Sequence, residues 1–379
     1  MKTADPNAGG EHGPFCRLSS GQVPLLILAA AALLVIGFLE ATRSLPADPL
    51  YSAKLAAAQR MELATRALRE ERLTRGIPIE PEIDPNATGL IGPEYTAITT
   101  TLGYLPAKRT STNPNMAGVL VAMLDRAGAK PGDCAAVGFS GSFPALNVAV
   151  LCALQAMELR PVIVSSVGAS SHGANDPRFT WLDMEQVLNE RGLFPWRSDA
   201  VSPGGVTSIP AFFGDEGIRE MQAAIARSGR PALDEQGDAS LQPDVTRRMA
   251  LYETGCGGRP AVFINVGGSL LALGTCRQAH ALPTGLLPPG IRSVGSGCGV
   301  IFRMAAAGVP VIHLLDIRKI ARDYGLPVDP ALLPVVPDGR VMSQGGYSRT
   351  AALIGLVILG MLGGLVKLQI KKYPLQMDS

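Results

Sequence analysis

The sequence predicts an α/β fold: a doubly wound, mostly parallel sheet in an extracytoplasmic domain, flanked by one N-terminal and one C-terminal transmembrane helix. Short apolar runs alternate with helical segments in the middle of the chain, Gly and Ser follow several of these runs, and long uncharged stretches stand near both ends. Strands buried on both faces have such continuous apolar sequences, so the alternation favours a parallel sheet covered by helices. An all-helical domain with short buried segments is the alternative, and the Gly-Ser turns argue against it.

The composition excludes several classes of protein. The 379 residues include 34 Lys and Arg against 32 Asp and Glu, and 47% of them are hydrophobic. So apolar a chain is not disordered. A net charge of +2 gives no basic excess for binding nucleic acid. Aromatic residues make up only 5%, which argues against stacking surfaces for single strands. We therefore expect no nucleic-acid partner.

The N-terminal hydrophobic segment is expected to be a transmembrane helix over residues 22–40. Residues 23–39 carry no charge, a length at the short end of the range that spans a bilayer. Lys2 and Arg17 precede the segment, so the positive-inside rule places residues 1–21 in the cytoplasm as a tail. A cleaved signal peptide is the alternative, but the apolar region is rather long and no clean small-x-small cleavage site follows it.

The C-terminal hydrophobic segment is expected to span the membrane over residues 350–368. A cluster of lysines at its end places residues 369–379 in the cytoplasm as a second tail. Gly360 and Gly364 form a GxxxG pattern that could let another helix approach closely, although glycine is common in spanning helices. With both tails inside, the main domain lies on the outer side of the cytoplasmic (inner) membrane, in the periplasm or outside the cell.

Between the spans, residues 41–93 are expected to form a membrane-proximal helix and a Pro-rich linker, and residues 94–340 the α/β domain. The helix covers 49–75, where Ala, Leu, Glu and Arg dominate. The expected strands lie at 134–139, 160–168, 259–268 and 309–316. The expected helices of the domain lie at 116–128, 144–157, 179–192, 214–229, 243–255, 297–308 and 317–325.

The outer domain would hold five of the six cysteines in an oxidising compartment. Cys256 and Cys276 lie in loop-like sequences and could pair. Cys134 and Cys152 lie in apolar sequences that favour buried thiols. The sequence alone leaves the pairing open.

Three polar loops follow predicted strands, at the edge where ligands bind in parallel α/β folds. They are Ser140-Gly141-Ser142, then Ser170, Ser171 and His172 with Asn175 and Asp176, and last Gly267-Gly268-Ser269. If the strands before the first two loops are neighbours, a hydroxyl, an imidazole and a carboxylate come together, which are the groups used in acyl transfer. Ser140 or Ser142 would then be the nucleophile, with His172 as the base and Asp176 as the carboxylate.

The sequence GFSGS at 138–142 is close to the G-x-S-x-G nucleophile elbow, but Ser142 replaces its last glycine. The order Ser, His, Asp also differs from the usual order in such hydrolases. The favoured interpretation is therefore an anion cradle, in which backbone N–H groups at a helix N-terminus point at a carboxylate or phosphate. The expected ligand-binding residues are Gly141, Ser170, Ser171, Asn175, Gly267, Gly268 and Ser269.

Basic residues could extend this cradle. Lys108, Arg109 and a later cluster around Arg318 could line a groove for an anionic polymer, although a solvated helix face also explains that cluster. His313 lies inside an apolar strand and is expected in the core. The sequence has no HExxH motif and no pair of CxxC motifs, so no metal is expected. The Gly-rich segment 294–299 lacks the Lys-Ser/Thr of a nucleotide loop, and no cofactor is expected.

Segments spread over nearly the whole chain resemble those of a known family. These segments are DPLYSAKLAAAQRM after the first span, GLIGPEYTAITTTLGYLPAKRTSTNPN, AAVGFSGSFPALN, SSVGASSHGAND, FINVGGSLLALG and the C-terminal span. In these features the chain resembles the poly-gamma-glutamate system proteins, membrane-tethered accessory proteins of capsule production. The resemblance implies a role in poly-gamma-glutamate biosynthesis and export, with the synthase membrane subunits and the anionic polymer as partners. It carries over no catalytic residues.

Three functions are compatible with the sequence. The outer domain could handle the polymer, whose glutamates each carry one negative charge at neutral pH. It could instead be a serine hydrolase or transpeptidase of gamma-glutamyl amide bonds, using Ser140 or Ser142 with His172. It could also be a structural scaffold that holds the synthase complex together through its spanning helices.

Overall fold

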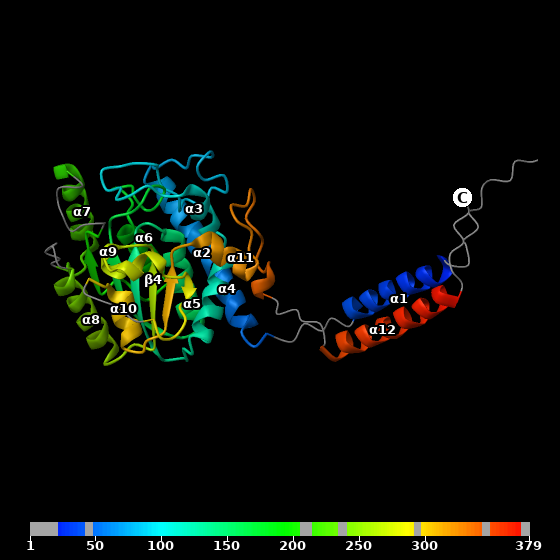
Figure 1. The fold of residues 1–379 in the computed structure, drawn as a ribbon. Coiled ribbons are helices and arrows are strands. Elements are labelled where there is room, and N and C mark those ends of the chain that lie inside the picture. The colour runs from blue at the N-terminus through cyan, green and yellow to red at the C-terminus, as the bar shows by residue number, and fades with distance from the viewer. Residues whose placement is uncertain are drawn as a thin grey trace, which may run out of the picture. The chain divides into compact units, whose positions relative to one another are not determined.

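The computed structural model describes residues 22–41, 48–204, 214–233, 241–291, 297–342 and 349–372 (Figure 1). The chain divides into two compact units: Met1–Pro46 with Gly345–Ser379, and Ala47–Gln344. The predicted tail at 1–21, part of the second tail (373–379) and the first half of the Gly-rich segment at 294–299 lie outside the described residues.

The terminal unit contains α1 (Gln22–Ala41) and α12 (Arg349–Lys372), both long and apolar enough to cross a membrane. The two helices pack on each other. A Cβ at Gly355 would lie 2.7 Å from Val35 Cγ1, and the two helices run antiparallel (Figure 1). Gly360 and Gly364 have nothing within 4 Å among the described atoms. The GxxxG pattern is therefore not used in this pairing.

The larger unit is built on a six-stranded sheet in the order β3-β2-β1-β4-β6-β5. The strands are β1 (Cys134–Ser140), β2 (Arg160–Ser166), β3 (Ala200–Ser202), β4 (Val262–Val266), β5 (Gly285–Leu286) and β6 (Val311–Leu314). Every neighbouring pair is parallel except β5 with β6. The mostly parallel α/β sheet is as predicted. The short strands β3 and β5 were not predicted, because two or three residues give no readable pattern.

Helices pack against both faces of this sheet (Figure 1). Residues of β1 alternate between two apolar clusters: Ala135 and Val137 belong to the first, Cys134 and Ala136 to the second. The first cluster contains residues of α2 (Tyr51–Thr74), α4 (Met116–Arg126), α5 (Pro144–Ala156), α6 (Trp181–Glu190) and α11 (Ile317–Tyr324). The second contains residues of α8 (Gln242–Cys256), α9 (Leu270–Leu273) and α10 (Val300–Ala306). The remaining helices are α3 (Leu105–Ser111), α7 (Gly214–Ser228), η2 (Arg277–Ala281) and η3 (Arg340–Met342).

The membrane-proximal helix α2 is part of the globular unit. Its small residues Ala57, Ala58 and Ala64 are fully buried against α4 and α5. Near its start, the Lys54 ammonium pairs with Asp48 at 2.7 Å and donates to the Val341 carbonyl at 3.0 Å. The first and last described parts of this unit are therefore held together at one place.

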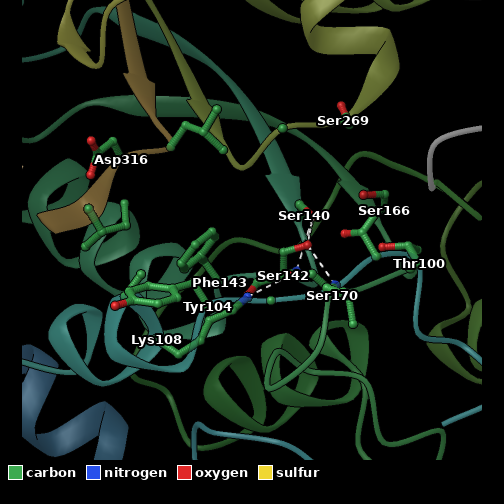
Figure 2. A pocket seen from close by; sticks show the side chains of 18 of the residues that line it. Thr100, Tyr104, Lys108, Ser140, Ser142, Phe143, Ser166, Ser170, Ser269 and Asp316 are labelled. Atoms are coloured by element: carbon green, nitrogen blue, oxygen red, sulfur yellow. Dashed lines mark hydrogen bonds between the residues drawn. The ribbon is translucent and has the colours of Figure 1, made fainter. Parts of the chain in front are cut away.

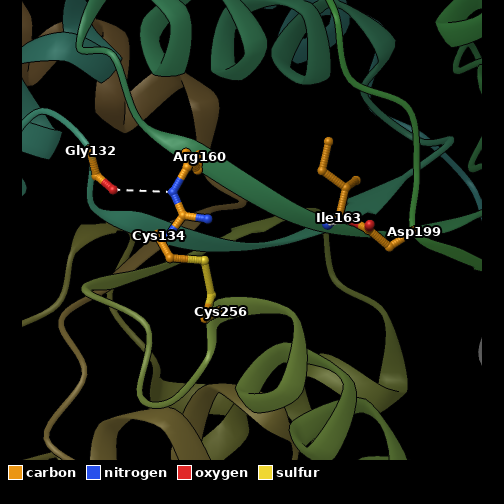
Figure 3. The surroundings of a disulfide bond; sticks show 6 residues. All are labelled: Gly132, Cys134, Arg160, Ile163, Asp199 and Cys256. Atoms are coloured by element: carbon orange, nitrogen blue, oxygen red, sulfur yellow. Dashed lines mark hydrogen bonds between the residues drawn. A yellow bond between two sulfur atoms is a disulfide. The ribbon is translucent and has the colours of Figure 1, made fainter.

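The cysteine pairs differ from the prediction. Cys256 does not pair with Cys276: it bonds Cys134, where the end of α8 meets the start of β1 (Figure 3). Cys276 bonds Cys298. Cys134 is thus a disulfide partner and not a free thiol, while Cys152 is the predicted buried thiol. The sequence could not show the first pairing, because the two partners are 122 residues apart.

The strand order places an opening at one edge of the sheet. β2 and β3 follow β1 on one side, and β4 and β6 lie on its other side. The connections that leave the carboxyl ends of β1 and β4 therefore diverge, which is where open α/β sheets bind ligands.

Candidate functional site

A cavity of about 480 Å³ lies at this edge. Loops after β1, β2, β4 and β6 line it, together with the segment from Thr100 to Lys108 (Figure 2). Of the predicted site residues, five line the cavity: Ser140, Ser142, Ser170, Gly268 and Ser269.

At the end of β1, the side chains of Ser140 and Ser142 are hydrogen-bonded to each other, and we call them the serine pair. Ser140 Oγ accepts from Ser142 N–H and donates to Ser142 Oγ, each at 3.1 Å. Gly141 is needed here because a Cβ would lie 2.6 Å from the Val167 carbonyl oxygen. Helix α5 begins directly after this loop, with Pro144 in its first turn. Its positive end therefore lies beside the cavity-lining residue Phe143.

Lys108 on α3 extends its side chain toward the loop after β1 and lines the cavity. Its side chain is only 3% exposed, and Nζ donates to Ser170 Oγ at 2.7 Å and to the Ser142 carbonyl. The ammonium also lies 4.0 Å from the centre of the Phe143 ring. No ion pair found in the described residues includes Lys108, and burial lowers its pKa to about 7.

Lys108 was predicted as one of the basic residues that could line a groove, but neither its burial nor its contact with Ser170 was predicted. The segment LPAKRTS gives no sign of either, because both arise from loops far along the chain. The basic pair Lys108-Arg109 has the composition of an exposed helix end.

The loop after β2 contributes Gly168 and Ser170 to the lining. Ser170 N–H donates to Ser142 Oγ at 3.0 Å, which joins the first two loops. Ser171 N–H donates to the Thr101 carbonyl at 2.9 Å. Asn175 Nδ2 donates to Thr99 Oγ1 at 3.0 Å and to the Pro93 carbonyl at 2.9 Å. Ser171 and Asn175 therefore anchor the segment that covers the loop, and neither lines the cavity.

The predicted Ser-His-Asp group is not assembled at the cavity. His172 Nδ1 lies 3.3 Å from the Gly92 carbonyl oxygen, and the side chain does not line the cavity. Asp176 pairs with Arg178 at 2.7 Å. Burial opposes ionisation of Asp176, but hydrogen bonds and charge from Arg178 outweigh it and lower the pKa. His172 therefore contacts the segment at Gly92, and Asp176 pairs within its own loop.

The loop after β4 closes the cavity on another side. Gly267 has φ of 89° and sits against the Ser140 side chain, where a Cβ would lie 3.1 Å from Ser140 Cβ. Ser269 Oγ accepts from Ala272 N–H at 3.2 Å and caps α9. Gly268 and Ser269 line the cavity, and Gly267 brings the loop close to the serine pair.

The outer wall combines charge and an aromatic ring. Arg318 on α11 stacks over the Tyr104 ring, with its Cζ 4.5 Å from the ring centre. Asp316 also lines the cavity and caps α11 by accepting from Lys319 N–H at 3.0 Å. The mouth thus carries one cation and one carboxylate.

His313 is a core residue, as predicted. Its Nδ1 lies 3.0 Å from Asn265 Nδ2, and burial lowers its pKa to about 4. No group of three or more metal-ligating side chains is found within the described ranges.

Comparisons of the chain with protein-family models, with curated proteins and with solved structures found no match.

Proposed function

We propose that the chain is a two-span protein of the cytoplasmic membrane whose α/β unit, outside the membrane, serves poly-gamma-glutamate capsule production by holding a segment of the polymer in the cavity. The proposal follows the resemblance in sequence. The apolar helices α1 and α12 support the membrane location. The two disulfides support an oxidising compartment, since such bonds are rare in the cytosol.

One observation carries the binding role: the cavity joins a row of hydroxyls to the cations Lys108 and Arg318. A gamma-linked glutamate chain alternates a backbone amide with a free carboxylate. Hydroxyls suit the amides, and Arg318 together with the protonated form of Lys108 suits the carboxylates. Asp316 at the mouth repels part of the chain and restricts where it enters. The synthase membrane subunits are the proposed partners of the spanning helices.

Binding to poly-gamma-glutamate oligomers tests this function in the detergent-solubilised full chain. We expect affinity that falls with added salt, and a loss on the order of tenfold in Arg318→Gln, the scale of one charge-assisted hydrogen bond. Arg322→Gln is the control, because Arg322 is exposed on the same helix and does not line the cavity. Equal losses in both variants, or none in Arg318→Gln, would reject the cavity as the binding site.

A further inference from the structure

We propose that Ser170 and Lys108 form a serine–lysine pair, in which Ser170 Oγ is the nucleophile and Lys108 Nζ its general base, so that the cavity cleaves or transfers carboxylic amide bonds. This is an activity beyond binding. The reactive pair is independent of the proposed function, and only the choice of a gamma-glutamyl amide as the substrate rests on it.

The contact has the geometry that general-base catalysis requires. Lys108 Nζ and Ser170 Oγ are 2.7 Å apart, and both residues line the cavity (Figure 2). They are 3% and 8% exposed, so the pair is shielded from bulk water on the protein side and open to a ligand in the cavity. A second contact of Nζ, to the Ser142 carbonyl, fixes the direction of the amine.

The charge state of Lys108 also suits a base. An ordinary lysine is protonated at neutral pH and cannot accept a proton. Burial brings the pKa of Lys108 to about 7, so that its neutral form is well populated there. The ammonium form of Lys108 donates to both the Ser142 carbonyl and Ser170 Oγ. Once neutral, the amine still donates to the Ser142 carbonyl, and its lone pair can accept the hydroxyl hydrogen of Ser170 across the same contact.

The Ser142 hydroxyl can donate a hydrogen bond to negative charge that develops in the cavity. Ser142 Oγ accepts from Ser140 Oγ and from Ser170 N–H, and no acceptor for its own hydroxyl hydrogen is found among the described residues. That hydrogen is available to an oxyanion that forms beside Ser170. The start of α5 adds the positive end of a 13-residue helix next to the same loop.

The reaction balances without a cofactor. Ser170 Oγ attacks the amide carbonyl carbon while its proton moves to Lys108 Nζ. The C–N bond breaks, the amine leaves with the proton from Lys108, and an ester links the acyl group to Ser170. Water or another amine then attacks this ester, giving a proton to Lys108, which returns it to Ser170 Oγ as the ester bond breaks.

A fluorophosphonate probe tests the nucleophile in the full chain in detergent, with peptide mapping of the modified serine. We expect labelling at Ser170, with a rate that rises with pH about a midpoint near 7. Ser170→Ala should abolish labelling, and Lys108→Met should slow it at least ~100-fold. Ser228→Ala is the control, because Ser228 is 5% exposed on α7 and does not line the cavity.

Because a buried lysine variant can fail to fold, the pH profile of the wild-type protein is a separate criterion. A rate without a rise between pH 5 and 9, labelling at Ser140 or Ser142, or no labelling of the folded protein would overturn the proposal. Binding of poly-gamma-glutamate to Ser170→Ala separates the two ideas. Retained binding with no acylation in the wild type rejects only the reaction, and acylation without polymer binding rejects only the proposed substrate.

Discussion

Glu185 on α6 is a fully buried carboxyl with neutral partners. Its Oε2 accepts from Ser198 N–H and its Oε1 from Ser198 Oγ, each at 2.8 Å. Burial raises its pKa to about 7, against the opposing effect of these hydrogen bonds and of Arg197 and Arg230. Glu185 and Lys108 thus reach the same pKa from opposite directions, one inside the core and one at a cavity.

This pKa predicts how stability depends on pH. Folding favours the protonated form of Glu185, so its contribution is complete below the ordinary pKa of 4.5 and is lost as pH rises through about 7. Glu185→Gln keeps an acceptor for Ser198 N–H and a donor for Ser198 Oγ without the charge. We expect this variant to be more stable than the wild type at pH 8 by roughly 1–3 kcal/mol, with little difference at pH 4.5.

Thermal unfolding at the two pH values measures the effect. Glu190→Gln at the exposed end of the same helix is the control and should behave as the wild type at both. A stability difference between Glu185→Gln and wild type that does not change with pH would contradict the buried-acid explanation.

Most strands and helices could be predicted from the sequence, but the contacts between them could not. β1, β2, β4 and β6 were predicted because each is a short apolar run, and α5 because PALNVAVLCALQA is a longer Ala- and Leu-rich segment that follows the Ser-Gly-Ser turn. The loops after β1, β2 and β4 were placed at one edge by the same logic. The partner of Ser170 was not predicted, because α3 reaches the site through tertiary packing and not through any sequence pattern.

The disulfide between β1 and α8 is expected to stabilise the globular unit by joining two elements far apart in the sequence. It closes a loop of 122 residues, and chain entropy sets its contribution at up to about 5 kcal/mol. We expect a reductant to lower the unfolding temperature of the wild type, and to lower it less in Cys134→Ala/Cys256→Ala, which starts from reduced stability and has only the Cys276–Cys298 bond left to lose. Cys152→Ala should keep the full response, because Cys152 is a free thiol. An equal response in wild type and double variant would show that this bond does not stabilise the unit.

At the scale of the whole molecule, the two-span arrangement can be tested directly. Leu332 is 83% exposed in the globular unit, whereas Lys372 ends α12. We expect a membrane-impermeant maleimide to label Leu332→Cys in intact spheroplasts, and to label Lys372→Cys only after permeabilisation. The reverse pattern, or labelling of Leu332→Cys only after permeabilisation, would contradict the proposed topology.

The clamp of Lys54 on Asp48 and Val341 has a mechanical consequence. Because the first and last described segments of the globular unit meet there, a force that separates its two ends acts on this small contact. Pulling apart the flanking segments would thus open the clamp while the polar edge of the sheet keeps its shape.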